Sequence, residues 1–183
     1  MQEVKKQLRR ELTAKRREMS RADKTTADKA VFECLKPYID RAGSVFTYVS
    51  TDIEVDTCRV LEYCFEKGIS VATPVSGDTE LTFYYVKSYD DLSVGRFGIL
   101  EPTNRETAAT ADKDTLCIVP ALCADGKGYR LGYGRGYYDR FLESFIGCSI
   151  IICYSDFRRE VPTEPHDKRA HFTIFDDTVM EVI

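Results

Sequence analysis

The sequence predicts an α/β fold: a single-domain, three-layer structure in which helices flank a mainly parallel central sheet. Two observations carry this prediction. Short runs of β-branched and aromatic residues alternate with segments of helical periodicity, which is the pattern of strand–helix–strand units. No internal repeat, low-complexity tract or Pro/Gly/Ser-rich linker divides the chain, and 183 residues are enough to bury one core, so residues 1–183 are predicted to form one domain.

The first two helices are predicted from residue spacing and from a capping signal. Residues 3 to about 18 carry apolar side chains at helical intervals. Ser20 followed by Asp23 resembles an N-cap with an acid at the reciprocal position. A second helix is therefore predicted from this cap to about Leu35.

Later segments have the composition of strands and of two further helices. The predicted strands are Ser44–Ser50, Ile69–Val75, Leu81–Val86, Thr115–Val119, Ser149–Tyr154 and Phe172–Phe175. One helix is predicted from about Thr57 to a C-cap at Gly68, and another over Tyr137–Phe145. Ligands of parallel sheets bind beyond the carboxyl ends of the strands. That rule directs attention to Ser50–Asp56, Pro120–Asp139 and Tyr154–Asp167.

Composition limits the possible classes of function. The net charge of −4 gives no general attraction to nucleic acid or membranes, although the first 24 residues are basic. The chain has no apolar run long enough to span a bilayer and no secretory signal. The seven cysteines form no C-x-x-C pair and are dispersed, which favours reduced thiols over a zinc site. We therefore expect a cytoplasmic protein with no nucleic-acid or membrane partner, as a monomer or weak homo-oligomer.

The most informative stretch is residues 126–140, which read GKGYRLGYGRGYYDR. Glycines let the backbone approach a ligand closely, and successive N–H groups can then surround an anion. The stretch leads into the helix predicted from Tyr137, whose N-terminal amides favour phosphate, and Arg130 and Arg135 add charge-assisted donors. It is neither a Walker A loop nor a dinucleotide fingerprint, because the required spacings are absent. Phosphate binding is favoured over a merely flexible hairpin, since flexibility does not explain the interleaved arginines, tyrosines and aspartate.

Four motifs, in order, resemble one known family. Residues 130–140, RLGYGRGYYDR, are similar to the signature of the 5-formyltetrahydrofolate cyclo-ligases (methenyltetrahydrofolate synthetases). Lys5-x-x-Leu8-Arg9 resembles the N-terminal nucleotide-binding helix of that family. Residues 50–57, STDIEVDT, resemble its segment with a substrate-binding glutamate, and residues 161–167, VPTEPHD, its late acidic motif. The resemblance implies ATP-dependent closure of 5-formyltetrahydrofolate into 5,10-methenyltetrahydrofolate, with Mg²⁺ as cofactor.

The resemblance also implies roles for individual residues. The ATP-binding positions are Lys5, Arg9, Arg130, Leu131, Gly132, Tyr133, Gly134, Arg135, Gly136, Tyr137 and Tyr138. The implied catalytic residues are Arg130, Arg135 and Lys5. The implied substrate contacts are Glu54 and Tyr137, and the implied metal positions are Asp139 and Asp167. After the acidic motif this chain has Ala170-His171 where many relatives carry an apolar–acid pair, which leaves the register of the last strand open.

The residues themselves support some of these roles more than others. Lys5 and Arg9 are four apart and share a helical face, which Arg16 continues, although a basic stripe is more often simply a solvated face. Asp139 beside a phosphate loop suits Mg²⁺, whereas Asp167 alone could equally be a turn or cap residue. Glu54 alone could be a surface acid, and Tyr137 a core aromatic.

Two other functions remain open from the sequence. The first is a nucleotide- or folate-binding module without turnover. The second is a small-molecule phosphotransferase with a different acceptor. Nucleic-acid binding through residues 4–24 is disfavoured by the acidic overall balance.

Overall fold

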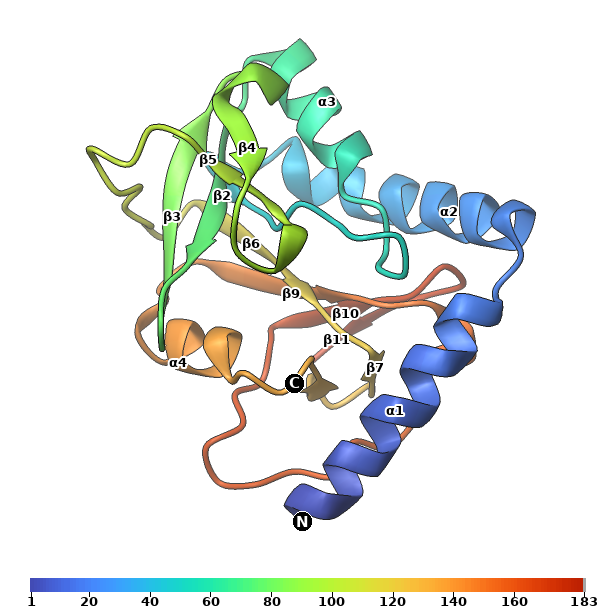
Figure 1. The fold of residues 1–183 in the computed structure, drawn as a ribbon. Coiled ribbons are helices and arrows are strands. Elements are labelled where there is room, and N and C mark those ends of the chain that lie inside the picture. Colours follow the sequence, from blue (N-terminus) through green and yellow to red (C-terminus); the bar gives the residue numbers. More distant parts are fainter. Residues whose placement is uncertain (183) are drawn as a thin grey trace.

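A seven-stranded sheet lies at the centre of the computed structural model, which describes residues 1–182 (Figure 1). The strand order is β11-β10-β9-β6-β1-β2-β3. The five inner strands are parallel, and the two edge strands, β11 and β3, run antiparallel to their neighbours. The sheet strands are β1 (Ser44–Phe46), β2 (Ser70–Ser76), β3 (Leu81–Val86), β6 (Thr115–Pro120), β9 (Cys148–Ile152), β10 (Phe172–Ile174) and β11 (Val179–Glu181).

Helices cover both faces of this sheet. They are α1 (Gln2–Glu18), α2 (Arg21–Ile39), α3 (Cys58–Lys67) and α4 (Tyr137–Ser144). On one face, Tyr38 of α2 packs against Phe172 of β10, with ring centroids 5.1 Å apart. On the other face, Phe141 of α4 packs against Phe83 of β3 at 4.8 Å. All six residues of β6 are buried, as expected for a strand covered on both sides. The predicted three-layer α/β fold is confirmed.

The remaining elements are short. Two small hairpins join β4 (Leu92–Val94) to β5 (Leu100–Pro102) and β7 (Cys123–Ala124) to β8 (Arg130–Leu131). Three 3₁₀ turns occur, η1 (Tyr89–Asp91), η2 (Arg96–Gly98) and η3 (Ser155–Phe157). Helix α1 runs obliquely past the β7–β8 hairpin (Figure 1). This arrangement brings the N-terminal helix to the edge where ligands of parallel sheets bind.

Most predicted elements are present, with informative differences at their ends. The Ser20 hydroxyl accepts the Asp23 amide at 3.1 Å and caps α2 as predicted. That helix continues four residues past Leu35, because Ile39, one turn further on, is also buried against the sheet. Strand β1 ends at Phe46 rather than Ser50, since the following segment bends to bond with residue Thr57.

The strand predicted at residues 172–175 is β10, and its register in the sheet is defined. Phe172 of β10 pairs with Ile150 of β9, which resolves the question left open at Ala170-His171. His171 lies just before the strand, where its Nδ1 accepts the Ser149 amide at 3.1 Å. Edge strand β11 was not predicted, because its residues lack a strong alternating pattern.

Gly147 precedes β9 at a point with no room for a side chain. A Cβ there would lie 2.1 Å from the Thr115 carbonyl oxygen and 2.8 Å from the Phe145 ring. We expect Gly147→Ala to lower the free energy of unfolding by about 3 kcal/mol, because backbone must move to relieve this overlap. Gly132→Ala is the control, since nothing lies within 4 Å of its Cβ position. Urea denaturation of both variants checks this; equal stabilities would contradict it.

Candidate active site at the carboxyl edge of the sheet

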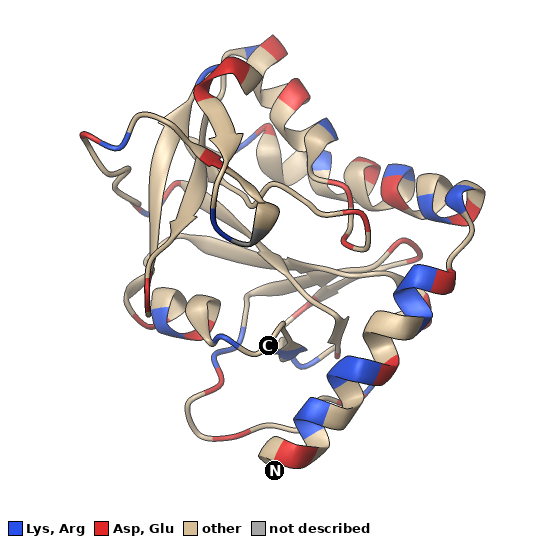
Figure 2. Cartoon of the chain, in the orientation of Figure 1, with Lys and Arg blue, Asp and Glu red and all other residues tan. Residues whose placement is uncertain are grey.

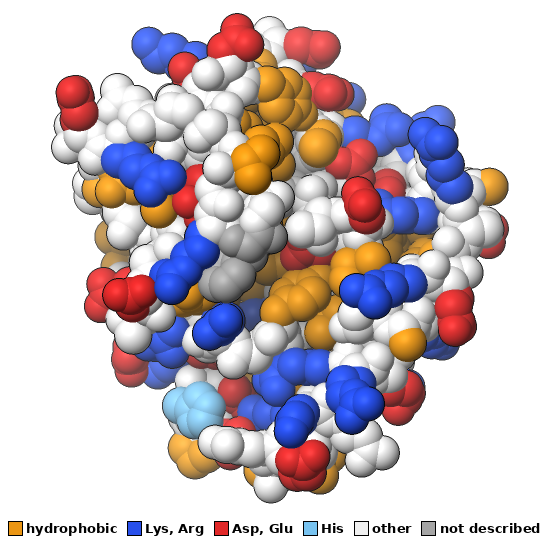
Figure 3. Space-filling model, viewed as in Figure 1, with side chains coloured by type: hydrophobic (Ala, Val, Ile, Leu, Met, Phe, Trp, Pro, Cys, Tyr) orange, Lys and Arg blue, Asp and Glu red, His pale blue; other side chains and the backbone are white. Residues whose placement is uncertain are grey.

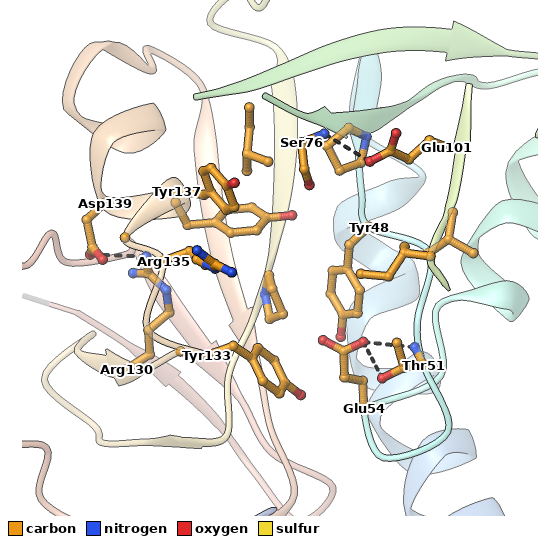
Figure 4. Close-up of a pocket in the computed structure, with 18 of the residues that line it drawn as sticks. Tyr48, Thr51, Glu54, Ser76, Glu101, Arg130, Tyr133, Arg135, Tyr137 and Asp139 are labelled. Atoms are coloured by element: carbon orange, nitrogen blue, oxygen red, sulfur yellow. Dashed lines mark hydrogen bonds and ion pairs between the residues drawn. The ribbon is translucent and has the colours of Figure 1, made fainter. Parts of the chain in front are cut away.

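An apolar cavity of about 370 Å³ opens at the carboxyl edge of β1 and β6 (Figure 4). Its walls come from the predicted segments 50–56 and 120–139, together with the β4–β5 hairpin. The side chains that define it include Tyr48, Glu54, Leu100, Pro120, Tyr133 and Tyr138. We refer to it below as the apolar cavity. Its size and mainly apolar lining, with the Glu54 carboxylate on one side, suit a flat ring system that has a polar edge.

A larger charged hollow of about 1120 Å³ lies beside it. Its basic residues are Lys5, Lys6, Arg9, Arg135, Arg140 and Lys168, and its acidic residues are Glu3, Asp139, Glu143, Glu164 and Asp167. Figure 2 shows that α1 contributes a dense row of Lys and Arg. Figure 3 shows basic side chains at the border of a hollow that contains apolar ones. The charged hollow suits a polyanion such as a nucleoside triphosphate.

The two hollows share one wall, formed by Arg135, Gly136 and Asp139. Gly134 and Gly136 have φ values of +98° and +66°, a conformation that favours glycine. Arg9 of α1 fits against this turn, where its Nε donates to the Gly132 carbonyl at 2.8 Å. A Cβ on Gly134 would lie 3.2 Å from the Arg9 guanidinium, so the glycine permits close approach of α1. Helix α4 begins directly after Gly136 and contributes Asp139 to the wall.

Arg130 and Asp139 form an ion pair next to the shared wall. Arg130 Nη2 lies 3.1 Å from Asp139 Oδ1, and the arginine side chain is only 4% exposed. The same carboxylate oxygen accepts the Lys168 amide at 3.1 Å, and Arg130 Nη1 donates to the Lys168 carbonyl at 3.2 Å. The pair therefore fixes Lys168, which follows the late acidic motif, against residues 126–140 (the glycine segment), although the two regions are far apart in the sequence.

Lys5 is held between two carboxylates of the late acidic motif. Its Nζ lies 2.6 Å from Asp167 Oδ2 and 3.0 Å from Glu164 Oε2. Burial lowers the pKa of Lys5, but the hydrogen bonds and charges of Asp167 and Glu164 outweigh that effect and raise it above its ordinary value. Lys5 is therefore a permanent cation on the floor of the charged hollow at neutral pH.

Glu54 lies on the opposite side of the apolar cavity from the glycine segment (Figure 4). It is buried, and its Oε2 accepts both the amide and the hydroxyl of Thr51 at 2.8 Å. Burial, with the charge of Glu54 adding to it, raises the pKa of the Tyr48 phenol well above its usual value. Burial also raises the pKa of Tyr138, whose hydroxyl has no hydrogen-bond partner among residues 1–182. The cavity thus combines a fixed carboxylate with neutral phenols.

Comparison with known proteins identifies the family. A sequence model described as the 5-formyltetrahydrofolate cyclo-ligase family matches residues 1–174. The chain belongs to this family. The 5-formyltetrahydrofolate cyclo-ligase of Mycolicibacterium smegmatis is 29% identical over 175 residues, 89% of each chain. A probable 5-formyltetrahydrofolate cyclo-ligase of Schizosaccharomyces pombe is 28% identical over 149 residues, 71% of this chain and 72% of that one.

A solved structure supports the same assignment. The NMR structure of Aquifex aeolicus 5,10-methenyltetrahydrofolate synthetase superposes with a TM-score of 0.86 at 28% identity, covering 98% of this chain and 93% of that one. The family resemblance is therefore confirmed, and so is the prediction of an enzyme of the ATP-dependent cyclo-ligase type.

The cyclo-ligase positions predicted from the sequence divide between the two hollows. Those lining the charged hollow are Lys5, Arg9, Gly134, Arg135, Gly136, Asp139 and Asp167. Those lining the apolar cavity are Glu54, Arg130, Gly132, Tyr133, Arg135, Gly136, Tyr137, Tyr138 and Asp139. The predicted ATP position Leu131 lines neither, because its side chain is buried in the core.

Tyr137 and Arg140 tie α4 to the β2–β3 turn. The Tyr137 hydroxyl donates to the Gly77 carbonyl at 2.8 Å, and Arg140 Nε donates to the Thr79 carbonyl at 2.6 Å. The Arg140 guanidinium also lies 5.6 Å from the Tyr137 ring centroid. These contacts hold the Tyr137 ring at the cavity wall, where the cyclo-ligase resemblance predicts a substrate contact.

Sequence reasoning gave no role to several residues of the site. Glu164 and Arg140 fall inside the quoted motifs, so their position next to the predicted residues was the available signal. Tyr48 and Leu100 carry no local signal, because only tertiary packing brings them to the cavity.

The carboxylates fit a cyclo-ligase that uses Mg²⁺. Residues 1–182 contain no cluster of three or more His, Cys, Asp or Glu arranged to hold a metal by themselves. Asp139 and Asp167 nevertheless both line the charged hollow, and each is matched by one cation, Arg130 or Lys5. Mg²⁺ is commonly bound by one or two carboxylates together with phosphate oxygens and water, so two carboxylates suffice.

None of the helices over residues 1–182 is long and apolar enough to cross a membrane.

Proposed function

We propose that this chain closes 5-formyltetrahydrofolate to 5,10-methenyltetrahydrofolate with conversion of ATP to ADP and phosphate. The observation that carries the proposal is the wall of Arg135, Gly136 and Asp139, shared by an apolar cavity and a charged hollow. A pterin in the first and a triphosphate in the second would meet at this wall. We also propose that residues 1–183 act as one domain. We further propose a cytoplasmic location, which the free state of all seven cysteines supports.

The formyl group must first be activated, because an amide-like oxygen is a poor leaving group. In our proposal the formyl oxygen attacks the γ-phosphorus of ATP, ADP departs, and a phosphorylated imidate forms. N10 then adds to the formyl carbon, and the C–O bond breaks as phosphate leaves. The N10 proton passes to the departing phosphate, which is basic enough to take it.

The protein contributes positioning and charge rather than a nucleophile. Lys5, Arg9 and Arg135 would hold the phosphates, and glycine-segment amides would stabilise the charge that develops during transfer. Asp139 and Asp167 would hold Mg²⁺, which neutralises phosphate charge when bound. Glu54 would accept hydrogen bonds from the polar edge of the folate. The apolar lining would exclude water, which competes for the activated intermediate.

The direct test is an absorbance assay. Purified protein is mixed with Mg-ATP and 5-formyltetrahydrofolate, and the near-ultraviolet band of methenyltetrahydrofolate is followed. We expect an increase that requires the protein, ATP and the folate together. No increase, with both ligands shown to bind, would refute turnover and favour a binding module. No increase and no folate binding would favour another phosphate acceptor.

Glu54→Gln is expected to impair use of the folate more than binding of ATP. Glutamine keeps an oxygen for Thr51 but removes the charge that faces the cavity. The expected loss in kcat/KM for the folate is roughly 10- to 100-fold, since hydrogen bonds to charged groups contribute about 1.5–3 kcal/mol. Asp52→Asn is the matched control, because Asp52 is an exposed acid of the same loop outside the cavity. Loss of ATP affinity alone would show that Glu54 has a different role.

A further inference from the structure

Arg16 of α1 is a buried cation that the proposed chemistry does not use. The sequence places it on the basic stripe of Lys5 and Arg9, but the structure separates it from them. It is 3% exposed, and it does not line the charged hollow. Arg16 Nη2 donates to the carbonyls of Ala121 and Leu122 at 2.8 and 3.1 Å, and Nη1 donates to the Ile53 carbonyl at 3.1 Å.

Two aromatic rings enclose the Arg16 guanidinium. Its central carbon lies 4.5 Å from the ring centroid of Tyr154 and 4.4 Å from that of Phe157. No carboxylate within residues 1–182 forms an ion pair with it. Burying a charge without an ionic partner is expensive, so neutral carbonyls, ring faces and the Cys153 sulfur, 3.4 Å from Nη2, must compensate it. A planar guanidinium suits this arrangement, whereas a lysine ammonium cannot stack or donate in several fixed directions.

The contacts of Arg16 converge on the loop that carries Glu54. Arg16 bonds the carbonyl of Ile53, the residue before Glu54. The hydroxyl of Tyr154, against which Arg16 stacks, lies 2.6 Å from Asp28 Oδ1 and 3.0 Å from the Glu54 carbonyl oxygen, and its one proton is shared between these two acceptors. Burial, followed by the hydrogen bond to Asp28, raises the pKa of Tyr154, so this phenol remains a donor. The consecutive carbonyls of Ile53 and Glu54 are therefore bonded by Arg16 and Tyr154, whose side chains stack on each other.

The other contacts of Arg16 reach the opposite wall of the apolar cavity. Ala121 and Leu122 follow Pro120, which lines the cavity. The Leu122 amide in turn donates to the Leu131 carbonyl at 2.8 Å, within the glycine segment and next to Gly132. A single side chain thus connects the Glu54 loop with the segment between β6 and β7.

We infer that Arg16 is a positioning residue for the folate: it holds Glu54 in place across the apolar cavity from the glycine segment. This inference rests on the proposed function. The ATP side of α1 is held separately, by Lys5 on Asp167 and by Arg9 on Gly132. Loss of Arg16 should therefore act on the folate and spare ATP.

The test compares the Michaelis constants for the two substrates. Arg16→Lys is expected to raise the KM for 5-formyltetrahydrofolate about 10-fold or more, with the KM for ATP changed less than about 3-fold. Tyr154→Phe removes the hydroxyl bonded to the Glu54 carbonyl, and should change the same constant in the same direction by a smaller factor. Arg17→Lys is the matched control, because Arg17 is the next basic residue of α1 and is exposed. Melting temperatures of all variants are measured in parallel.

Each outcome decides the inference. Equal changes in both Michaelis constants, or no change in either, would overturn a folate-positioning role and leave Arg16 a stability residue. If Arg16→Lys does not fold, Tyr154→Phe decides by the same comparison of constants. Turnover by the wild type with unchanged constants in the variants would refute this inference alone. Absence of wild-type turnover would instead refute the proposed function and, with it, the folate-specific role.

Discussion

Asp139→Asn is expected to reduce ring closure by at least about 100-fold while the fold survives. Asparagine keeps an oxygen that can accept from Arg130 and from the Lys168 amide, so the local packing can persist. It removes the negative charge at the wall shared by both hollows, where our proposal places Mg²⁺ and the reacting phosphate. Electrostatic groups at a reacting centre commonly contribute about 10²–10³ in turnover.

The measurement is turnover at saturating Mg-ATP and folate, with a thermal melt of each protein. Glu160→Gln is the control, because Glu160 is an exposed acid in an ion pair with Lys127, 3.1 Å away, and lines neither hollow. It should retain turnover within about 3-fold, as expected for an exposed pair. Near-normal turnover of Asp139→Asn would refute the assignment of Asp139.

Lys5→Met is expected to reduce kcat/KM for ATP by about 100-fold or more. The ammonium is the buried cation between Asp167 and Glu164, and methionine keeps most of the length of the side chain without the charge. Without Lys5 the two acids confront the triphosphate directly, which opposes binding as well as transfer. The raised pKa of Lys5 means that its stabilising contribution is complete below its ordinary value of 10.5 and is lost only as pH rises beyond it.

Steady-state kinetics at varied ATP checks this expectation near pH 7, where Lys5 is fully charged. Arg10→Met provides the control, since Arg10 is an exposed cation of the same helix and does not line the charged hollow. Equal effects of the two substitutions would mean that the general basic charge of α1 matters, rather than the ion pairs of Lys5.

The individual helices and strands were predicted well because the signals for them lie within short stretches of the sequence. Helical spacing, the Ser20 cap, the Gly68 C-cap and the apolar strand runs each depend on a few neighbouring residues. The strand order and the β4–β5 hairpin could not be obtained in this way. They depend on which elements pack together, and the hairpin residues carry only a weak apolar pattern.

The site shows the same division. The glycine segment and the acidic motif were recognisable as motifs. The sequence did not show that the predicted site residues line two separate hollows. Lys5 meets Asp167 across 162 positions of sequence, and Arg9 meets Gly132 across 123. Arg16 is the clearest case, because its helical position predicts a solvated or phosphate-facing cation, whereas tertiary packing turns it inward.

The wall shared by the two hollows has a thermodynamic consequence. In our proposal Arg135 and Gly136 form part of both binding surfaces, so either ligand would restrict the same few backbone torsions. Binding of the first ligand would cost the conformational entropy of ordering these torsions. The second ligand would then bind a wall that is already ordered. The two affinities are then linked, and the factor by which ATP tightens folate binding must equal the factor by which folate tightens ATP binding.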